Sequence, residues 1–175
     1  QNARRSWKWT DDLLSKKADL EFSASPERDF ARSAFTCGYG SNGEFDDSVT
    51  HMRTVEFIKD QGPPFFRITD ELRSKNKKVH SYEQMWHLET CELALSDDAF
   101  TADFGEGVTL EAKVRSENGK FVDMIGSKEP YYQGWMPISP PGPHEHRPIH
   151  TPVLKGTFKG SATIKAVFRP KRRNP

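Results

Sequence analysis

Hydrophobic and polar residues alternate along most of the chain from Val49 onward. Strict alternation places one face of a strand against a core and the other against water, which is typical of antiparallel sheets. Gly, Pro, Asn and Asp residues separate the alternating runs and predict turns between them. The predicted strands lie at 49–59, 65–72, 79–93, 99–104, 108–114, 121–125 and 162–169. So many short strands without an amphipathic helix predict an all-β protein with an antiparallel β-sandwich.

The sequence predicts three segments. Residues 49–170 are expected to form the antiparallel β-sandwich, and residues 171–175 a basic tail. Residues 1–48 lack a clear period and predict an irregular N-terminal segment that packs on the sheet through its aromatic side chains. The strands predicted to pair are 49–59 with 65–72, 65–72 with 79–93, and 99–104 with 108–114.

Composition narrows the function classes. The 175 residues carry a formal net charge of +1 and contain no apolar run that could span a bilayer. Charge and hydropathy therefore predict neither a nucleic-acid partner nor a membrane partner. Cys37 and Cys91 match no zinc spacing, and the sequence leaves a disulfide between them open. Because the chain starts at Gln1, we expect it to begin inside a longer protein or after processing.

Three histidines near the C-terminal third are the candidates for a metal site. His144, His146 and His150 lie within seven residues, with Glu145 as the one further ligand nearby. The prolines around them fix the backbone, so convergence of the imidazoles would depend on the loop geometry. The sequence favours an exposed or partly packed loop, and we assign no metal ligand in this chain.

Two aromatic runs are candidates for sugar binding. Tyr131, Tyr132 and Trp135 flank a glycine, and such aromatics either stack on a sugar ring or plug the end of a sandwich. The run from His80 to Leu88 is the second candidate, and it also has two interpretations. On a strand, its alternate residues form either a sugar-binding stripe or, as the sequence favours, part of the interior.

Several motifs follow one another along the chain. The run from Val49 to Lys59 contains T-H-x-R-x-V-x-F-x-K, and an aromatic-rich strand at 65–72 and an H-x-Y-E-x-x-W-H-L run at 80–88 come after it. Gln133-Gly-Trp and Arg147-Pro-Ile complete the set. In this order the motifs resemble the C-terminal β-sandwich portion of heparinase II/III-like polysaccharide lyases. The resemblance covers roughly residues 35–170.

This resemblance implies a function and a setting. The family joins an α-helical toroid to antiparallel β-sheet layers and cleaves uronic-acid-containing polysaccharides by β-elimination. The resemblance implies that the partners of this chain are an acidic polysaccharide and an upstream α-helical toroid domain. It further implies a secreted or periplasmic location. It also implies a structural zinc in the complete enzyme, but no cofactor in this chain.

The chain departs from the family at its catalytic motifs. It contains neither a Gly-His-x-His strand nor a His-Asn-Thr sequence, which by order would lie upstream of Gln1. We therefore expect the isolated chain to lack most catalytic residues and to be inactive. Tyr39 is the candidate catalytic residue, and Arg53, with Tyr131, Tyr132 and Trp135, is a candidate for substrate binding. The alternative is a non-catalytic carbohydrate-binding or structural β-sandwich module.

Overall fold

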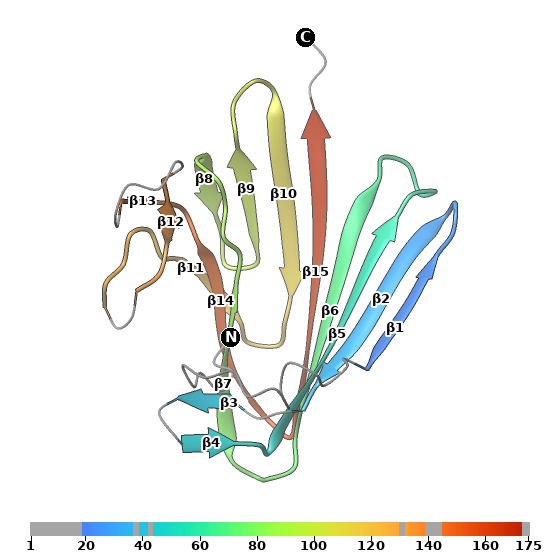
Figure 1. Cartoon of the computed structure of the whole chain (residues 1–175), viewed down its shortest axis with the longest axis vertical. Coiled ribbons are helices and arrows are strands. Elements are labelled where there is room, and N and C mark those ends of the chain that lie inside the picture. Colours follow the sequence, from blue (N-terminus) through green and yellow to red (C-terminus); the bar gives the residue numbers. More distant parts are fainter. Residues whose placement is uncertain (1–18, 37–38, 42–43, 130–131, 139–144, 173–175) are drawn as a thin grey trace. The chain divides into compact units, whose positions relative to one another are not determined.

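The computed structural model describes residues 19–36, 39–41, 44–129, 132–138 and 145–172, and these residues form strands and turns without a helix (Figure 1). No helix in this part of the chain could therefore span a membrane. The strands are β1 (Leu20–Ala24), β2 (Arg28–Phe35), β3 (Tyr39–Ser41), β4 (Glu44–Asp46), β5 (Val49–Ile58), β6 (Phe65–Ser74), β7 (Val79–Met85), β8 (Glu92–Leu95), β9 (Ala99–Asp103), β10 (Val108–Arg115), β11 (Lys120–Asp123), β12 (Trp135–Pro137), β13 (His146–Pro148), β14 (Pro152–Lys159) and β15 (Ser161–Arg172).

The strands form antiparallel sheets, which confirms the predicted all-β, sandwich-like fold. The largest sheet has eight strands in the order β1-β2-β5-β6-β15-β10-β9-β8. A three-stranded sheet has the order β11-β14-β7, and β12-β13 and β3-β4 form two-stranded sheets. The chain divides into two compact units, Gln1–His80 with Phe158–Ala166, and Ser81–Thr157 with Val167–Pro175.

The first unit is built on the pairing of β5 with its neighbours β2 and β6. Each of the ten residues of β5 has a partner in β6, from Val49 opposite Ser74 to Ile58 opposite Phe65. Val49 and Ile58 are buried at the two ends of β5 and lie on opposite faces of the strand, and Phe65 is buried opposite Ile58. The long register fixes which side chains of β5 and β6 face each other, and this positions the first candidate site.

The second unit contains strands of both the eight-stranded and the three-stranded sheet, packed through aromatic rings. Phe100 of β9 contacts Phe121 of β11 edge to face, with ring centroids 5.6 Å apart. Trp86 lies 6.2 Å from Phe100, 5.5 Å from Phe121 and 5.8 Å from Phe168. Such aromatic packing buries large areas and stabilises the sheet-on-sheet contact.

Tyr82 in β7 packs closely onto the neighbouring strand β14 at a glycine. A Cβ atom at Gly156 would lie 2.4 Å from the Tyr82 hydroxyl oxygen, which is closer than real Cβ contacts come. Only glycine leaves room for this ring. The same region accounts for the run from His80 to Leu88, in which Gln84 and Leu88 are buried and Trp86 joins the aromatic cluster. These contacts favour the interior interpretation of that run.

The segment 1–48 differs from the irregular structure that the sequence predicts. Its described residues include β1 and β2, which extend the eight-stranded sheet beyond β5. All five residues of β1 are exposed, so this edge strand has no buried face to produce an alternating pattern. The C-terminal boundary also differs, because β15 runs to Arg172 and Lys171 forms an ion pair with Glu111.

The predicted strand 79–93 and one predicted pairing are also wrong. β7 ends at Met85, and β8 begins at Glu92 in a different sheet. The neighbours of β6 are β5 and β15, so 65–72 does not pair with 79–93. The predicted pairs 49–59 with 65–72 and 99–104 with 108–114 are confirmed. Alternation identifies a strand, but it carries no information on the sheet that the strand joins.

Candidate functional site

The first candidate site is a chain of hydrogen bonds in the first unit that links Tyr39, His51, Asp70 and Arg53. Register places Arg53 of β5 directly opposite Asp70 of β6, and His51 lies two residues earlier on the same face of β5. The Tyr39 hydroxyl lies 2.9 Å from His51 Nδ1, and His51 Nε2 lies 2.6 Å from Asp70 Oδ1. Arg53 donates from Nε and Nη2 to the two Asp70 oxygens, at 2.6 and 3.0 Å.

The buried carboxylate of Asp70 organises this site. Asp70 is only 2% exposed. Burial by itself would raise the pKa of Asp70, but the hydrogen bonds from His51 and Arg53 outweigh burial and hold the pKa below its ordinary value. Asp70 is therefore ionised at neutral pH, and its two-point contact with Arg53 fixes the orientation of the guanidinium.

The Asp70 carboxylate also determines the tautomer of neutral His51. An ionised carboxylate only accepts hydrogen bonds, so His51 Nε2 carries the proton and Nδ1 accepts from the Tyr39 hydroxyl. Burial, followed by the charge of Asp70, raises the pKa of Tyr39 to about 12, while Arg53 opposes this shift. Tyr39 therefore keeps its proton at neutral pH unless His51 takes it.

This arrangement has the logic of a proton relay. A hydroxyl donates to an imidazole, and the opposite ring nitrogen of the imidazole donates to a buried carboxylate. In hydrolytic triads, the same order lets the imidazole accept the hydroxyl proton while the carboxylate stabilises the imidazolium that forms. The Tyr39 oxygen can thus act as a base when His51 takes its proton. The contacts also tie β3 to β5 and β6, so they stabilise the fold.

The sequence predicted two of these four residues. Tyr39 and Arg53 were candidates, and the structure brings them to opposite ends of one network. His51 and Asp70 were missed. The sequence does contain a signal for Asp70. This carboxylate lies two residues before Leu72, so both side chains fall on the same, buried face of β6. Buried acids without partners are rare, so that position predicts a basic partner on a neighbouring strand.

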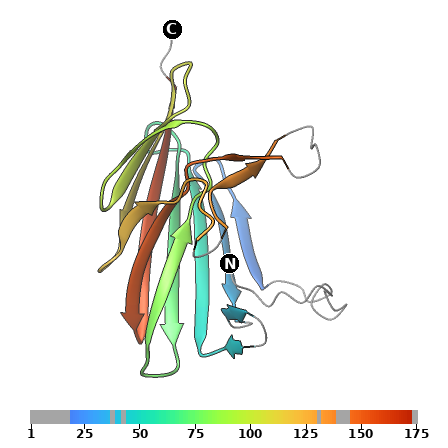
Figure 2. The same cartoon turned by 90° about the vertical axis from the view of Figure 1, so that its left-hand side faces the viewer.

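The second candidate site is a pocket of about 540 Å³ in the second unit. Its lining residues come from the segment after β7, from the loop that leads to β12, from β12 itself and from β13. Besides Gly134, the residues that line it are His87, Lys128, Tyr132, Gln133, Trp135, Pro137 and His146. Figure 2 shows the β12–β13 hairpin, in orange, extending away from β11 and β14. The pocket combines aromatic rings with amide, imidazole and ammonium groups.

The backbone beneath this pocket requires a glycine. Gly134 has a φ of +73°, and a Cβ atom there would lie 2.0 Å from the Met124 carbonyl oxygen. The Gly134 carbonyl accepts hydrogen bonds from the amides of Gly126 and Ile149, at 3.0 and 2.8 Å. Trp135 Nε1 donates to the Ser127 carbonyl at 2.9 Å, which holds the indole in place. The Gln133-Gly134-Trp135 motif thus has a structural cause.

The candidates for sugar and metal binding are distributed unevenly. Tyr132, Trp135 and His146 line the pocket, whereas Tyr131 and His144 lie outside the described residues. His150 contacts Asp123 instead, with Nδ1 2.6 Å from Oδ2. Within the described ranges, no three His, Cys, Asp or Glu side chains are arranged to hold a metal ion. Cys91 is a free, half-buried thiol, and Cys37 lies outside the described residues.

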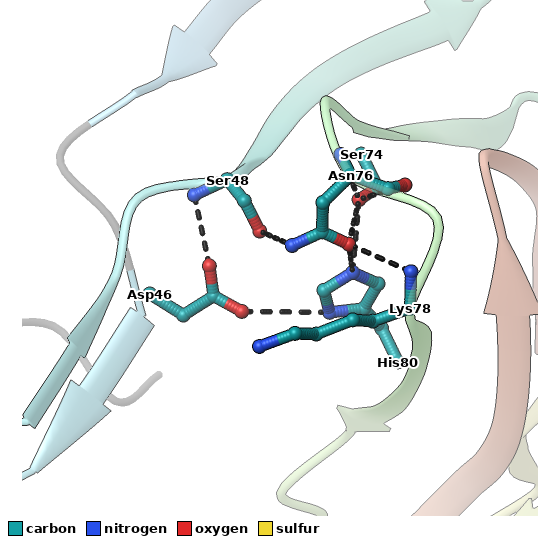
Figure 3. A network of polar contacts seen from close by, with 6 residues as sticks. All are labelled: Asp46, Ser48, Ser74, Asn76, Lys78 and His80. Carbon is teal, nitrogen blue, oxygen red and sulfur yellow. Dashed lines mark hydrogen bonds and ion pairs between the residues drawn. The ribbon is translucent and has the colours of Figure 1, made fainter.

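A third polar network, around His80, holds a corner of the first unit together (Figure 3). His80 Nε2 lies 2.8 Å from Ser74 Oγ and 3.0 Å from Asn76 Oδ1, and Nδ1 lies 3.6 Å from a carboxylate oxygen of Asp46. Asn76 Nδ2 donates to Ser48 Oγ at 2.8 Å, and the imidazole stacks on Phe158. These contacts join the turn after β6 to the corner between β4 and β5, which is a structural role.

The fold resembles that of a solved structure described as "Heparinase III-BT4657 gene product", with a TM-score of 0.63. The likeness covers 90% of this chain and 22% of that chain, at 15% sequence identity. No protein-family model matches the sequence, and no curated protein matches it. At this identity the likeness establishes the fold. The chain thus has the fold of a part of heparinase III and spans about a fifth of that protein's length.

Proposed function

We propose that this chain is the C-terminal β-sandwich part of a polysaccharide lyase that cleaves uronic-acid-containing polysaccharide by β-elimination. The observation that carries the proposal is the likeness in fold to part of heparinase III over 90% of this chain. The ordered motifs, from the strand at 49–59 to Arg147-Pro-Ile149, support the same family independently of the fold.

In this proposal, the relay around Tyr39 is one wall of the active site. β-Elimination removes the C5 proton of a uronate, forms the C4–C5 double bond and breaks the bond from C4 to the leaving O4. Tyr39 accepts the C5 proton while its own proton passes to His51 Nδ1, and the imidazolium faces Asp70. O4 then takes a proton from Tyr39, and His51 returns its proton to the phenolate oxygen. The protons balance within the relay.

The remaining parts of the site belong to the proposed upstream α-helical toroid domain. That domain would neutralise the uronate carboxylate and close the cleft, so the isolated chain is expected to be inactive. A structural zinc belongs to the complete enzyme in this proposal, and the described residues contain no group of three His, Cys, Asp or Glu side chains arranged to hold a metal ion. A secreted or periplasmic location belongs to the same proposal, because polysaccharide substrates are encountered outside the cytoplasm.

The test is an elimination assay on a panel of uronans, including alginate and heparan sulfate. The full-length protein that contains these residues should release unsaturated uronate products, detected by their ultraviolet absorbance, and the isolated 175-residue chain should release none. Absence of product from the full-length protein across the panel would refute the proposal.

A substitution tests the relay within that assay. Tyr39→Phe in the full-length protein should lower kcat by about 100-fold or more, because it removes the proton-transfer group and keeps the ring. Phe22→Tyr, which changes one ring hydroxyl at an exposed position of β1 in the same unit, is the matched control and should leave kcat unchanged. If Tyr39→Phe keeps wild-type kcat, the network has a structural role and the catalytic residues lie elsewhere.

A further inference from the structure

We infer that the pocket around Tyr132 and Trp135 is a second, non-catalytic binding site for an anionic saccharide, complete within the second unit. The inference adds a binding site to the proposed function. It rests on that function for one point, namely that the saccharide comes from the uronic-acid-containing polysaccharide. The site differs from the relay around Tyr39 in its residues and in its chemistry, because it offers a ring platform and a cation in place of a proton relay.

The aromatic side chains point to a sugar ring as the ligand. Tyr132 is 73% exposed, which is unusual for a large aromatic side chain, and Trp135 lies half-buried in the same pocket. A sugar ring presents C–H groups on its faces and hydroxyls at its edge. Aromatic faces can therefore pack against the ring, while Gln133 at the pocket wall offers an amide to the hydroxyls.

The charges at the pocket select an acidic sugar. The described side chains that line it include Lys128 and two histidines but no carboxylate, although the whole chain has 25 acidic and 26 basic residues. Among the described residues, the Lys128 ammonium forms no ion pair or hydrogen bond. The neighbouring acid Glu89 is paired with Arg147. Lys128 is thus available to a ligand carboxylate or sulfate.

The pocket is built before any ligand binds. The Ser127–Gln133 bridge and the hydrogen bonds to the Gly134 carbonyl fix the backbone on both sides of the platform. The indole of Trp135 is held by its bond to the Ser127 carbonyl. Because these groups lose little freedom on binding, a small ligand can gain useful affinity from few contacts. The cavity volume of about 540 Å³ lies in the range of small-ligand sites.

Isothermal titration calorimetry of the 175-residue chain tests the inference. The ligands are an oligomannuronate and an oligogalacturonate of one length, a neutral cello-oligosaccharide of that length, and an oligoglutamate of equal charge. At least one acidic oligosaccharide should bind, and binding should weaken with added salt. Neither the neutral sugar nor the acidic peptide should bind. No binding of either acidic sugar, or equal binding of the neutral sugar or the peptide, would overturn the inference.

Substitutions locate the binding. Lys128→Glu and Tyr132→Ala should each weaken the bound acidic oligosaccharide by about tenfold or more, and Tyr132→Phe should keep the affinity because it keeps the ring. Lys113→Glu, at an exposed lysine of β10 in the same unit, makes the same change in net charge and should have little effect. Circular dichroism and thermal melting confirm that each variant folds. Equal losses in Lys113→Glu and Lys128→Glu would contradict a localised site.

The inference and the proposed function fail in different experiments. If the full-length protein releases unsaturated product but the chain binds no acidic oligosaccharide, the lyase assignment stands and the pocket inference is wrong. If the chain binds acidic oligosaccharides through Lys128 and Tyr132 but the full-length protein releases no product, the pocket stands. In that case the chain belongs to a carbohydrate-binding protein.

Discussion

Asp70 is the residue on which the network of the first unit depends. Its carboxylate is almost fully buried, and it accepts hydrogen bonds from His51 Nε2 and from both Nε and Nη2 of Arg53. A buried carboxylate with charged partners stabilises a fold only while all its bonds are kept. Substitutions of single residues are therefore the most direct tests of this network.

Asp70→Asn should lower the free energy of unfolding by about 2–3 kcal/mol, because the amide cannot hold both His51 and Arg53 and leaves a guanidinium without its counter-charge. Urea denaturation measures the change. The matched control is Asp97→Asn, whose ion pair with Lys120 has both side chains 72% exposed, and which should cost less than about 1 kcal/mol. Equal costs for the two variants would contradict the structural importance of Asp70.

The raised pKa of Tyr39 predicts that the free energy of unfolding depends on pH in the alkaline range. Its pKa is about 12 in the fold, above the ordinary tyrosine value of 10.0, so the folded state favours the protonated form. The stability that this provides is complete below pH 10 and is lost as the pH rises towards 12. Unfolding free energies measured from pH 9 to 12 should fall more steeply in the wild type than in Tyr39→Phe. Parallel curves would show that Tyr39 is not buried in this way.

The same residues show what the sequence predicts and what it leaves out. Residue type and position marked Tyr39 and Arg53 as candidates, because a phenol and a guanidinium suit proton transfer and anion binding. His51 and Asp70 became visible only with the register of β5 on β6, which sets Arg53 opposite Asp70. Register depends on contacts between strands, and one strand's pattern does not contain them.

At the scale of elements, the turn before β12 determines the second site. Two glycines with similar backbone angles allow a matched comparison, because Gly134 has a φ of +73° and Gly160 one of +77°. A Cβ atom at Gly134 would meet the Met124 carbonyl at 2.0 Å, whereas one at Gly160 would have nothing within 4 Å.

Gly160→Ala should therefore cost about 1 kcal/mol for the positive φ alone, and Gly134→Ala clearly more, since the backbone must move. Thermal denaturation measures the stabilities, and calorimetry with acidic oligosaccharide measures the pocket. Binding should be lost in Gly134→Ala and kept in Gly160→Ala. Equal stability and binding in the two variants would show that the turn tolerates a side chain.

Elements were predictable where one face is buried. The positions of β5, β6, β9 and β10 agree with the alternating runs, and buried and exposed residues alternate clearly in β9. β1 was missed because both its faces are exposed, and the run 79–93 was predicted as one strand although the chain leaves one sheet at Met85 and enters another at Glu92. The hydrophobic pattern of a strand indicates which face is buried. It identifies neither edge strands nor the points at which the chain passes from one sheet to another.

At the scale of the molecule, the resemblance carried by the sequence motifs and the likeness in fold both support the proposed function. The motifs follow one another in the order expected for the C-terminal part of a lyase, and the fold matches a part of heparinase III across 90% of the chain. The sequence supplied the family resemblance, whereas the two sites required the positions of side chains that lie far apart along the chain.

Elimination activity of the full-length protein with and without these 175 residues tests the central claim most directly. The full-length protein should release unsaturated uronate products, and the protein truncated before Gln1 should lose nearly all of this activity, because the β-sandwich part forms one wall of the site. Full activity in the truncated protein would contradict the account, since these residues would then have no part in the reaction.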